Sequence, residues 1–183
     1  MEMTMKTPVF LVAPLVLTAA LAGCTSGQAQ VDVTTTNVAS FPAPPAEVQA
    51  LAGGQVMTSD AAISIDVKQE LDDLGKLGAL TGEVSKNEVA GPDLDLLQHI
   101  VVTIASHDGQ MPEEVLSESD VPRNHTAMQL PLLLTTGKII EYLSEGKVDM
   151  HFYLTGQIPT RTLTLTHTLV AHVDVAMKGA VKL

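Results

Sequence analysis

The chain contains one cysteine, Cys24, and the chemistry open to a single thiol is narrow. One Cys cannot form an intramolecular disulfide, a redox pair or a zinc site built from several thiolates. Its position is informative, because it directly follows the apolar run Pro8–Ala22 and Gly23. That run is too short for a transmembrane helix, which needs about 20 apolar residues, and Pro14 interrupts it. Residues 1–23 are therefore predicted to be a signal peptide.

The segment ends in Leu21-Ala22-Gly23-Cys24, which resembles the lipobox of bacterial lipoprotein precursors. The resemblance implies that a signal peptidase recognises Leu21, Ala22 and Gly23 and cuts before Cys24. The Cys24 sulfur would then carry diacylglycerol, and the new amino group would carry a further acyl chain such as palmitate. Two or three acyl chains hold a protein durably on a bilayer, whereas one chain binds marginally. An ordinary secretory signal with a chance Cys is the alternative.

The remainder of the chain is predicted to be one domain, residues 31–183, behind a lipidated Cys and tether at 24–30. Thr25 and Ser26 stand where inner-membrane lipoproteins commonly carry Asp, so the same resemblance implies the outer membrane if the host is Gram-negative. The partner this predicts is the membrane of the cell envelope, with an envelope protein as a further candidate. The net charge of −11, with only 10 Lys and Arg, argues against nucleic acid as a partner.

Alternating apolar and polar residues predict several strands, and two segments switch to a helical period. The predicted strands include 31–36, 63–67, 80–89, 100–106, 126–134, 148–155 and 162–178, whereas 113–120 stays unassigned. The predicted helices are 68–77 and 137–145, the second capped by Thr135 or Thr136 and ended by Gly146. This pattern predicts an all-β fold, mainly β with two short helices, as an antiparallel β-sandwich or barrel-like sandwich.

The last strands carry the clearest alternation. A hairpin between 148–155 and 162–175 would place Phe152 opposite Leu165 and keep the apolar residues of both strands on one face. The second strand is too long for one sheet, so it is predicted to bend or bulge near Ala171 and serve two sheets.

Six His residues raise the question of a metal, but no pair has a ligand spacing such as His-x-His, and no metal site or cofactor is predicted. His167 differs from the others because its phase places it on the apolar face, opposite Met150. A buried His bonded to the backbone is one interpretation, and a group lining a ligand cavity, with Met150, is the other. The Gly91–Asp95 segment is interpreted as a turn rather than a calcium loop.

Enzyme signatures such as a nucleophile elbow or a phosphate loop are absent, so no catalytic residue is predicted. The chain body also resembles uncharacterised β-rich lipoproteins of the myxobacterial type. The resemblance rests on these segments: Phe41-Pro42, Glu70–Leu77, the 91–95 turn before a strand, and the C-terminal helix. It implies no activity. The leading hypothesis is a non-enzymatic interaction or structural module on a lipid anchor. The alternatives are a carrier of an apolar ligand between the sheets and, more remotely, a hydrolase.

Overall fold

The computed structural model describes residues 16–18, 28–43, 56–66, 80–157 and 160–176. Cys24, most of the predicted signal peptide and the predicted helix at 68–77 lie outside the described residues. None of the helices within the described ranges is both long and apolar enough to cross a membrane.

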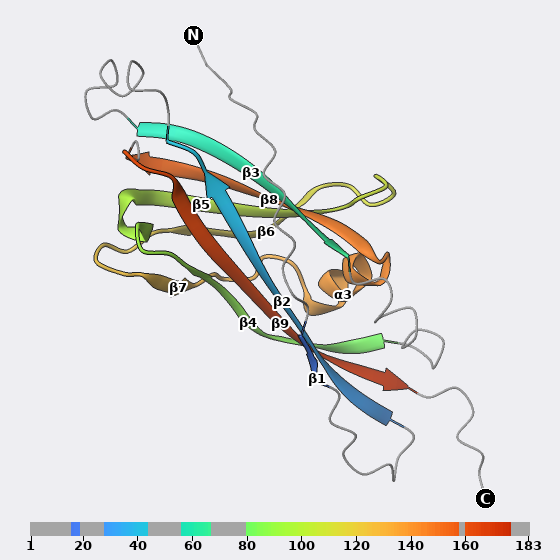
Figure 1. Cartoon of the computed structure of the whole chain (residues 1–183). Coiled ribbons are helices and arrows are strands. Elements are labelled where there is room, and N and C mark those ends of the chain that lie inside the picture. Colours follow the sequence, from blue (N-terminus) through green and yellow to red (C-terminus); the bar gives the residue numbers. More distant parts are fainter. Residues whose placement is uncertain (1–15, 19–27, 44–55, 67–79, 158–159, 177–183) are drawn as a thin grey trace, which may run out of the picture.

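The described strands form two antiparallel sheets that pack face to face as a β-sandwich, which confirms the predicted fold class (Figure 1). One sheet has the strand order β1-β2-β9-β4-β7, and the other has the order β3-β8-β5-β6. The strands are β1 Val16–Thr18, β2 Gln28–Phe41, β3 Val56–Asp66, β4 Leu80–Ala90, β5 Leu97–Ser106, β6 Glu114–Asp120, β7 Ala127–Gln129, β8 Lys147–Gln157 and β9 Leu163–Ala176. A 3₁₀ turn, η1 (Leu94–Leu96), overlaps the end of the predicted turn after β4.

The predicted hairpin of β8 and β9 is wrong, because the two strands belong to different sheets. β8 pairs with β3 and β5, whereas β9 pairs with β2 and β4. The predicted faces are correct, since the even residues of Val148–Leu154 and the odd residues of Leu163–Val173 are buried. These faces meet across the sandwich, where the rings of Phe152 and His167 lie edge-on at 5.4 Å. Alternation specifies which face a strand buries, and it does not specify the neighbouring strand.

The predicted bend of β9 near Ala171 is also wrong. β9 stays in one sheet and pairs with β2 in unbroken register over its whole length. The irregularity lies on the other neighbour, β4, where Val84 pairs with Ala171 and Lys86 pairs with Val170. Ser85 is therefore the extra residue of a bulge in β4, which adapts to the long β9 strand.

Three further segments differ from the sequence prediction in extent. β2 continues five residues beyond the predicted end at Thr36, to Phe41, and the unassigned segment 113–120 forms β6. The predicted strand at 126–134 contains only the three residues of β7, which lies at the edge of its sheet as the nearby Pro131 predicts.

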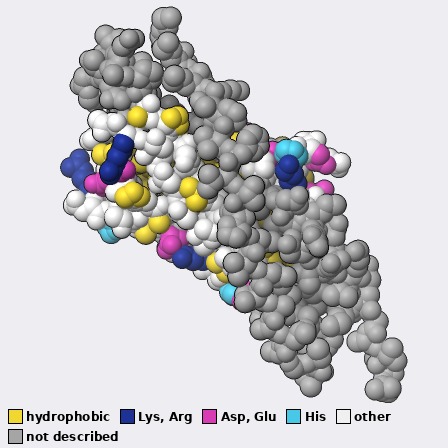
Figure 2. All heavy atoms as spheres, in the orientation of Figure 1, with side chains coloured by type: hydrophobic (Ala, Val, Ile, Leu, Met, Phe, Trp, Pro, Cys, Tyr) yellow, Lys and Arg dark blue, Asp and Glu magenta, His cyan; other side chains and the backbone are white. Residues whose placement is uncertain are grey.

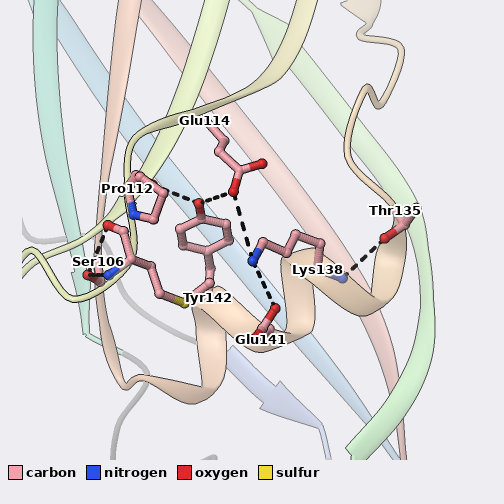
Figure 3. A network of polar contacts seen from close by, with 8 residues as sticks. Ser106, Pro112, Glu114, Thr135, Lys138, Glu141 and Tyr142 are labelled. Atoms are coloured by element: carbon pink, nitrogen blue, oxygen red, sulfur yellow. Dashed lines mark hydrogen bonds and ion pairs between the residues drawn. The ribbon is translucent and has the colours of Figure 1, made fainter.

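Helix α3, Thr136–Ser144, confirms the second predicted helix. The Thr135 side chain accepts a hydrogen bond from the Lys138 backbone N–H, and Gly146 follows the helix with a φ of 95°. Tyr142 anchors the helix to the start of β6 and to the chain just before it (Figure 3). Its hydroxyl donates toward the Pro112 carbonyl at 2.7 Å and the Glu114 carboxylate at 2.9 Å. Burial, together with the Glu114 charge, raises the pKa of Tyr142 to about 12.

Aliphatic side chains from both sheets and α3 fill the space between the layers. The largest fully buried side chains are Phe41, Leu94, Ile100, Ile104, Leu116, Ile139, Tyr142, Leu143, Met150, Phe152, Leu154 and Leu165. Burial of such side chains is worth about 1.5–3 kcal/mol each, so this interior supplies most of the stabilising free energy.

Gly82 is a position where the fold depends on the absence of a side chain. Its φ is +157°, and a Cβ there would lie 1.9 Å from the carbonyl oxygen of His172 on β9. We expect Gly82→Ala to lower the free energy of unfolding by about 3 kcal/mol, because backbone atoms must separate. Gly137→Ala is the matched control, since its Cβ would meet no atom within 4 Å and Ala favours a helix. Urea unfolding measures both, and equal stability of the two variants would contradict the packing described.

Candidate functional site

His167 lies where the sequence predicts it, on the inner face of the sandwich, and it is fully buried on β9. Its Nε2 lies 2.8 Å from Oδ1 of Asn87 on β4. The Asn87 amide in turn donates from Nδ2 to Ser117 Oγ at 2.7 Å and to the Leu130 carbonyl at 3.2 Å. A chain of polar groups therefore runs from β9 through β4 to β6, in the opposite sheet.

These contacts determine the protonation of the His167 ring. Because Asn87 Nδ2 must donate to the Leu130 carbonyl, Asn87 Oδ1 faces His167 and can only accept. Nε2 of His167 is therefore the protonated nitrogen, and Nδ1 carries a lone pair. Burial lowers the pKa of His167 to about 4, so the ring is neutral at pH 7. Because the Nε2–H of His167 donates to the Asn87 amide oxygen, Nε2 does not activate a nucleophile. The nearby hydroxyl of Ser117 is bonded to Asn87 and not to His167.

Met150 is the second residue predicted for this site, and it lies in the opposite sheet from His167. It is fully buried on β8, where its register partners are Ile63 on β3 and Ile104 on β5. The two predicted residues thus face the same interior from opposite layers, and Phe152 supplies the ring contact to His167. Whether this interior takes a ligand stays a prediction.

The structure adds two residues that the sequence analysis did not identify, Thr35 and Asn37 on β2. Asn37 is the direct register partner of His167, and both side chains are buried. Within the described ranges, three buried side-chain polar atoms have no hydrogen-bond partner: Thr35 Oγ1, Asn37 Nδ2 and His167 Nδ1. Thr35 lies within the predicted strand 31–36, and continuing its alternation to Phe41 would have added Asn37, because the odd residues from Val33 to Phe41 are all buried.

The other His residues with described polar contacts pair with carboxylates on the surface. The ring of His99 lies 2.9 Å from Asp120 and 3.2 Å from Glu118, His107 lies 2.9 Å from Asp149, and His172 contacts Asp32. The hydrogen bond with Asp120 raises the pKa of His99, and that with Asp32 raises the pKa of His172. No cluster of three or more His, Cys, Asp or Glu side chains that could hold a metal ion occurs among the described residues.

The segment Gly91–Asp95 is a turn, and its Asp93 carboxylate accepts hydrogen bonds from the guanidinium of Arg161, one of them from Nε at 3.0 Å. On the face drawn in Figure 2, the charged side chains of the described residues are scattered and do not gather into one patch. The described part of this face therefore offers separate charges rather than a concentrated charged site.

Comparison with known protein families finds no match, and comparison with curated proteins also finds none. Among solved structures, the chain is similar to the C-terminal family 22 carbohydrate-binding module of Clostridium thermocellum Xyn10B. The identity is 12%, the TM-score is 0.18, and the match covers 92% of this chain and 85% of that chain. A likeness at this level carries no argument about function.

The buried ring of His167 makes stability depend on pH. A His in the unfolded chain takes up a proton near pH 6.5, whereas the buried ring takes it up near pH 4. The unfolded chain therefore binds more protons between these values, and the free energy of unfolding falls as the pH falls through that window. The ring's contribution is fully present above pH 6.5, and about 3 kcal/mol of it is lost by pH 4.

Urea unfolding at pH 7 and pH 4 tests this dependence with His167→Gln as the comparison. The variant keeps an amide donor but cannot titrate. We therefore expect its free energy of unfolding to fall by about 3 kcal/mol less than that of the parent between pH 7 and pH 4. The surface carboxylates and the other His residues titrate in both proteins and cancel in the difference. Identical pH profiles would contradict a neutral buried ring, and NMR titration of the ring gives an independent reading of its pKa.

Proposed function

We propose that this protein is a cell-envelope lipoprotein, held on the membrane by acyl chains on Cys24, whose β-sandwich serves as a non-enzymatic interaction or structural module. The observation that carries the proposal is the place of Cys24, the single thiol of the chain, at the end of an apolar segment and a lipobox-like Leu21-Ala22-Gly23. Thr25 and Ser26 support placement in the outer membrane of a Gram-negative host.

The start of the first long strand supports an anchor close to the folded domain. β2 begins at Gln28, four residues after Cys24 and inside the tether expected at 24–30. Four residues of extended chain reach at most roughly 14 Å, so an anchored Cys24 would hold this end of the sandwich near the bilayer. The net charge of −11 would oppose close contact of the body with anionic lipid.

The filled interior supports a module rather than a container. Side chains of β8 and β9 occupy the middle of the sandwich, and Phe152, Leu154 and Leu165 are each almost completely buried there. The aliphatic packing stabilises a rigid body whose outer faces remain for contacts with other molecules.

A second candidate function is the carriage of an apolar ligand or lipid between the sheets, near His167 and Met150. It is supported by the unpartnered Nδ1 of His167, a buried acceptor that a hydroxyl group of a ligand could satisfy.

The anchor is tested by metabolic labelling with palmitate in a bacterium that processes lipoproteins. Cys24→Ser should abolish the label and release the protein from membranes, because no other thiol is available for acylation. Ser26→Ala is the matched control and should keep the full label. A Cys24→Ser protein that still carries labelled palmitate would falsify the proposed anchor.

The module and carrier functions differ in what copurifies with the protein. We expect solvent extracts of the purified full chain to contain no stoichiometric lipid by mass spectrometry. Acyl chains bound covalently to Cys24 are not counted in this measurement. Stoichiometric lipid that is lost in His167→Leu but retained in His107→Leu, a surface control, would favour the carrier instead.

A further inference from the structure

β2 lies one strand in from the edge of its sheet, beside the three-residue β1, and it has few of the features that prevent strands from associating. It pairs with β9 through fourteen consecutive residues without a register shift. Its sequence contains no Pro, no Gly and no Lys, and Asp32 is its single charged residue. Natural sheets protect their edges with short strands, Lys, Pro or bulges, and β7 at the other edge of the same sheet follows this pattern with three residues.

Among the described strands, only β1 pairs with the outer side of β2. β1 lies antiparallel on Asp32, Val33 and Thr34, and so demonstrates that this edge accepts an added strand. Yet residues 16–18 belong to the predicted signal peptide. Cleavage before Cys24 would therefore remove β1, the one described strand on this side of β2.

The register of β2 allows it to pair with itself. In an antiparallel pair, the two faces of the sheet continue across the junction only when opposite residues have numbers of the same parity. A two-fold axis at Thr36 meets this condition, because paired numbers then sum to 72. It keeps the two Asp32 residues apart, each opposite Ser40 of the other copy, so no like charges face each other.

The same register brings hydrogen-bond partners to two of the buried side-chain atoms that have none in the single chain. Asn37 of one copy lies opposite Thr35 of the other, and both side chains lie on the inner face. Asn37 Nδ2 is a donor without an acceptor, and Thr35 Oγ1 can accept, so each junction brings two complementary pairs together. Shifting the register by two residues in either direction places Asn37 opposite Val33 or opposite the second Asn37, and loses this match.

We infer that, after the signal peptide is removed, β2 pairs antiparallel with β2 of a second copy about Thr36, and joins two β2-β9-β4-β7 sheets into one eight-stranded sheet. This inference rests on the proposed function, because it needs cleavage before Cys24. The antiparallel arrangement places the two Cys24 anchors at opposite ends of the joined strands, so the strands lie along the membrane surface. Anchoring on one surface also raises the effective concentration of the two copies.

The test uses Thr36→Cys in the full chain, expressed in a bacterium that processes lipoproteins, with oxidation of isolated membranes. Opposite residues of an antiparallel pair have Cα atoms about 4.5–5.5 Å apart, within the range of a disulfide. Thr168→Cys is the matched control, since Thr168 is the register partner of Thr36 one strand further in and is also half-buried. In the joined sheet, the residues at position 168 of the two copies would lie three strand spacings apart, roughly 14 Å, which is too far for a disulfide.

We expect most of the processed Thr36→Cys protein to migrate at twice its mass on a non-reducing gel. The Thr168→Cys protein should migrate at the mass of one copy. The parent should do the same, because its Cys24 sulfur would be alkylated. Palmitate labelling of the same samples separates the two proposals. Label without the Thr36→Cys dimer overturns the pairing and leaves the anchor standing, whereas loss of the label overturns the anchor and, with it, the freed edge. Equal dimers from both Cys variants would indicate random collision and overturn the pairing.

A second measurement does not depend on oxidation. Light scattering of the detergent-extracted parent should give the mass of two copies. Thr36→Lys should give one copy, because it places two positive charges directly opposite each other at the axis. Thr168→Lys should keep two copies. A parent with the mass of one copy at micromolar concentration overturns the inference.

Discussion

β8 and β9 are the central strands of the two sheets, and their inner faces meet where the ring of Phe152 packs edge-on against His167. Each of the two strands has a neighbour on both sides, so this contact determines the position of four further strands, β2, β3, β4 and β5. The chain is poor in aromatic residues, with 3% Phe, Trp and Tyr, so aliphatic side chains around this contact provide most of the buried area. Stability therefore depends on close fit between two long alternating strands.

Polar groups inside this aliphatic core limit how the sheets can be arranged. The Asn87 amide satisfies His167 of its own sheet and Ser117 of the opposite one, and therefore links the two layers at one position. A different strand pairing would leave these groups buried without partners, which costs about 1–3 kcal/mol for each group. The network thus adds specificity to a core whose aliphatic side chains alone would tolerate several alignments.

The proposed anchor, Cys24, and strand β2 are close neighbours in the sequence, so cleavage before Cys24 would affect both. β2 begins four residues after Cys24, and β1, which covers part of its outer side, precedes Cys24. One proteolytic cut would therefore both create the membrane anchor and change the edge of the larger sheet. An anchored Cys24 would leave this strand end little freedom to move away from the bilayer, which would favour contacts between neighbouring copies on one membrane.

The sequence by itself determined the faces of the strands, the cap and end of α3, the turn at Gly91–Asp95 and the interior position of His167, because each follows from local chemistry or from a period of two. The tertiary structure decided which strands are neighbours. β8 and β9 separate into two sheets, and β4 rather than β9 carries the bulge, because pairing depends on contacts between residues far apart in the chain. The same holds for the neighbours of His167, since Asn87 bonds to it only when β4 flanks β9, and Asn37 lies opposite it only when β2 does. Local alternation is identical in all these arrangements, and only the packing of the complete core distinguishes between them.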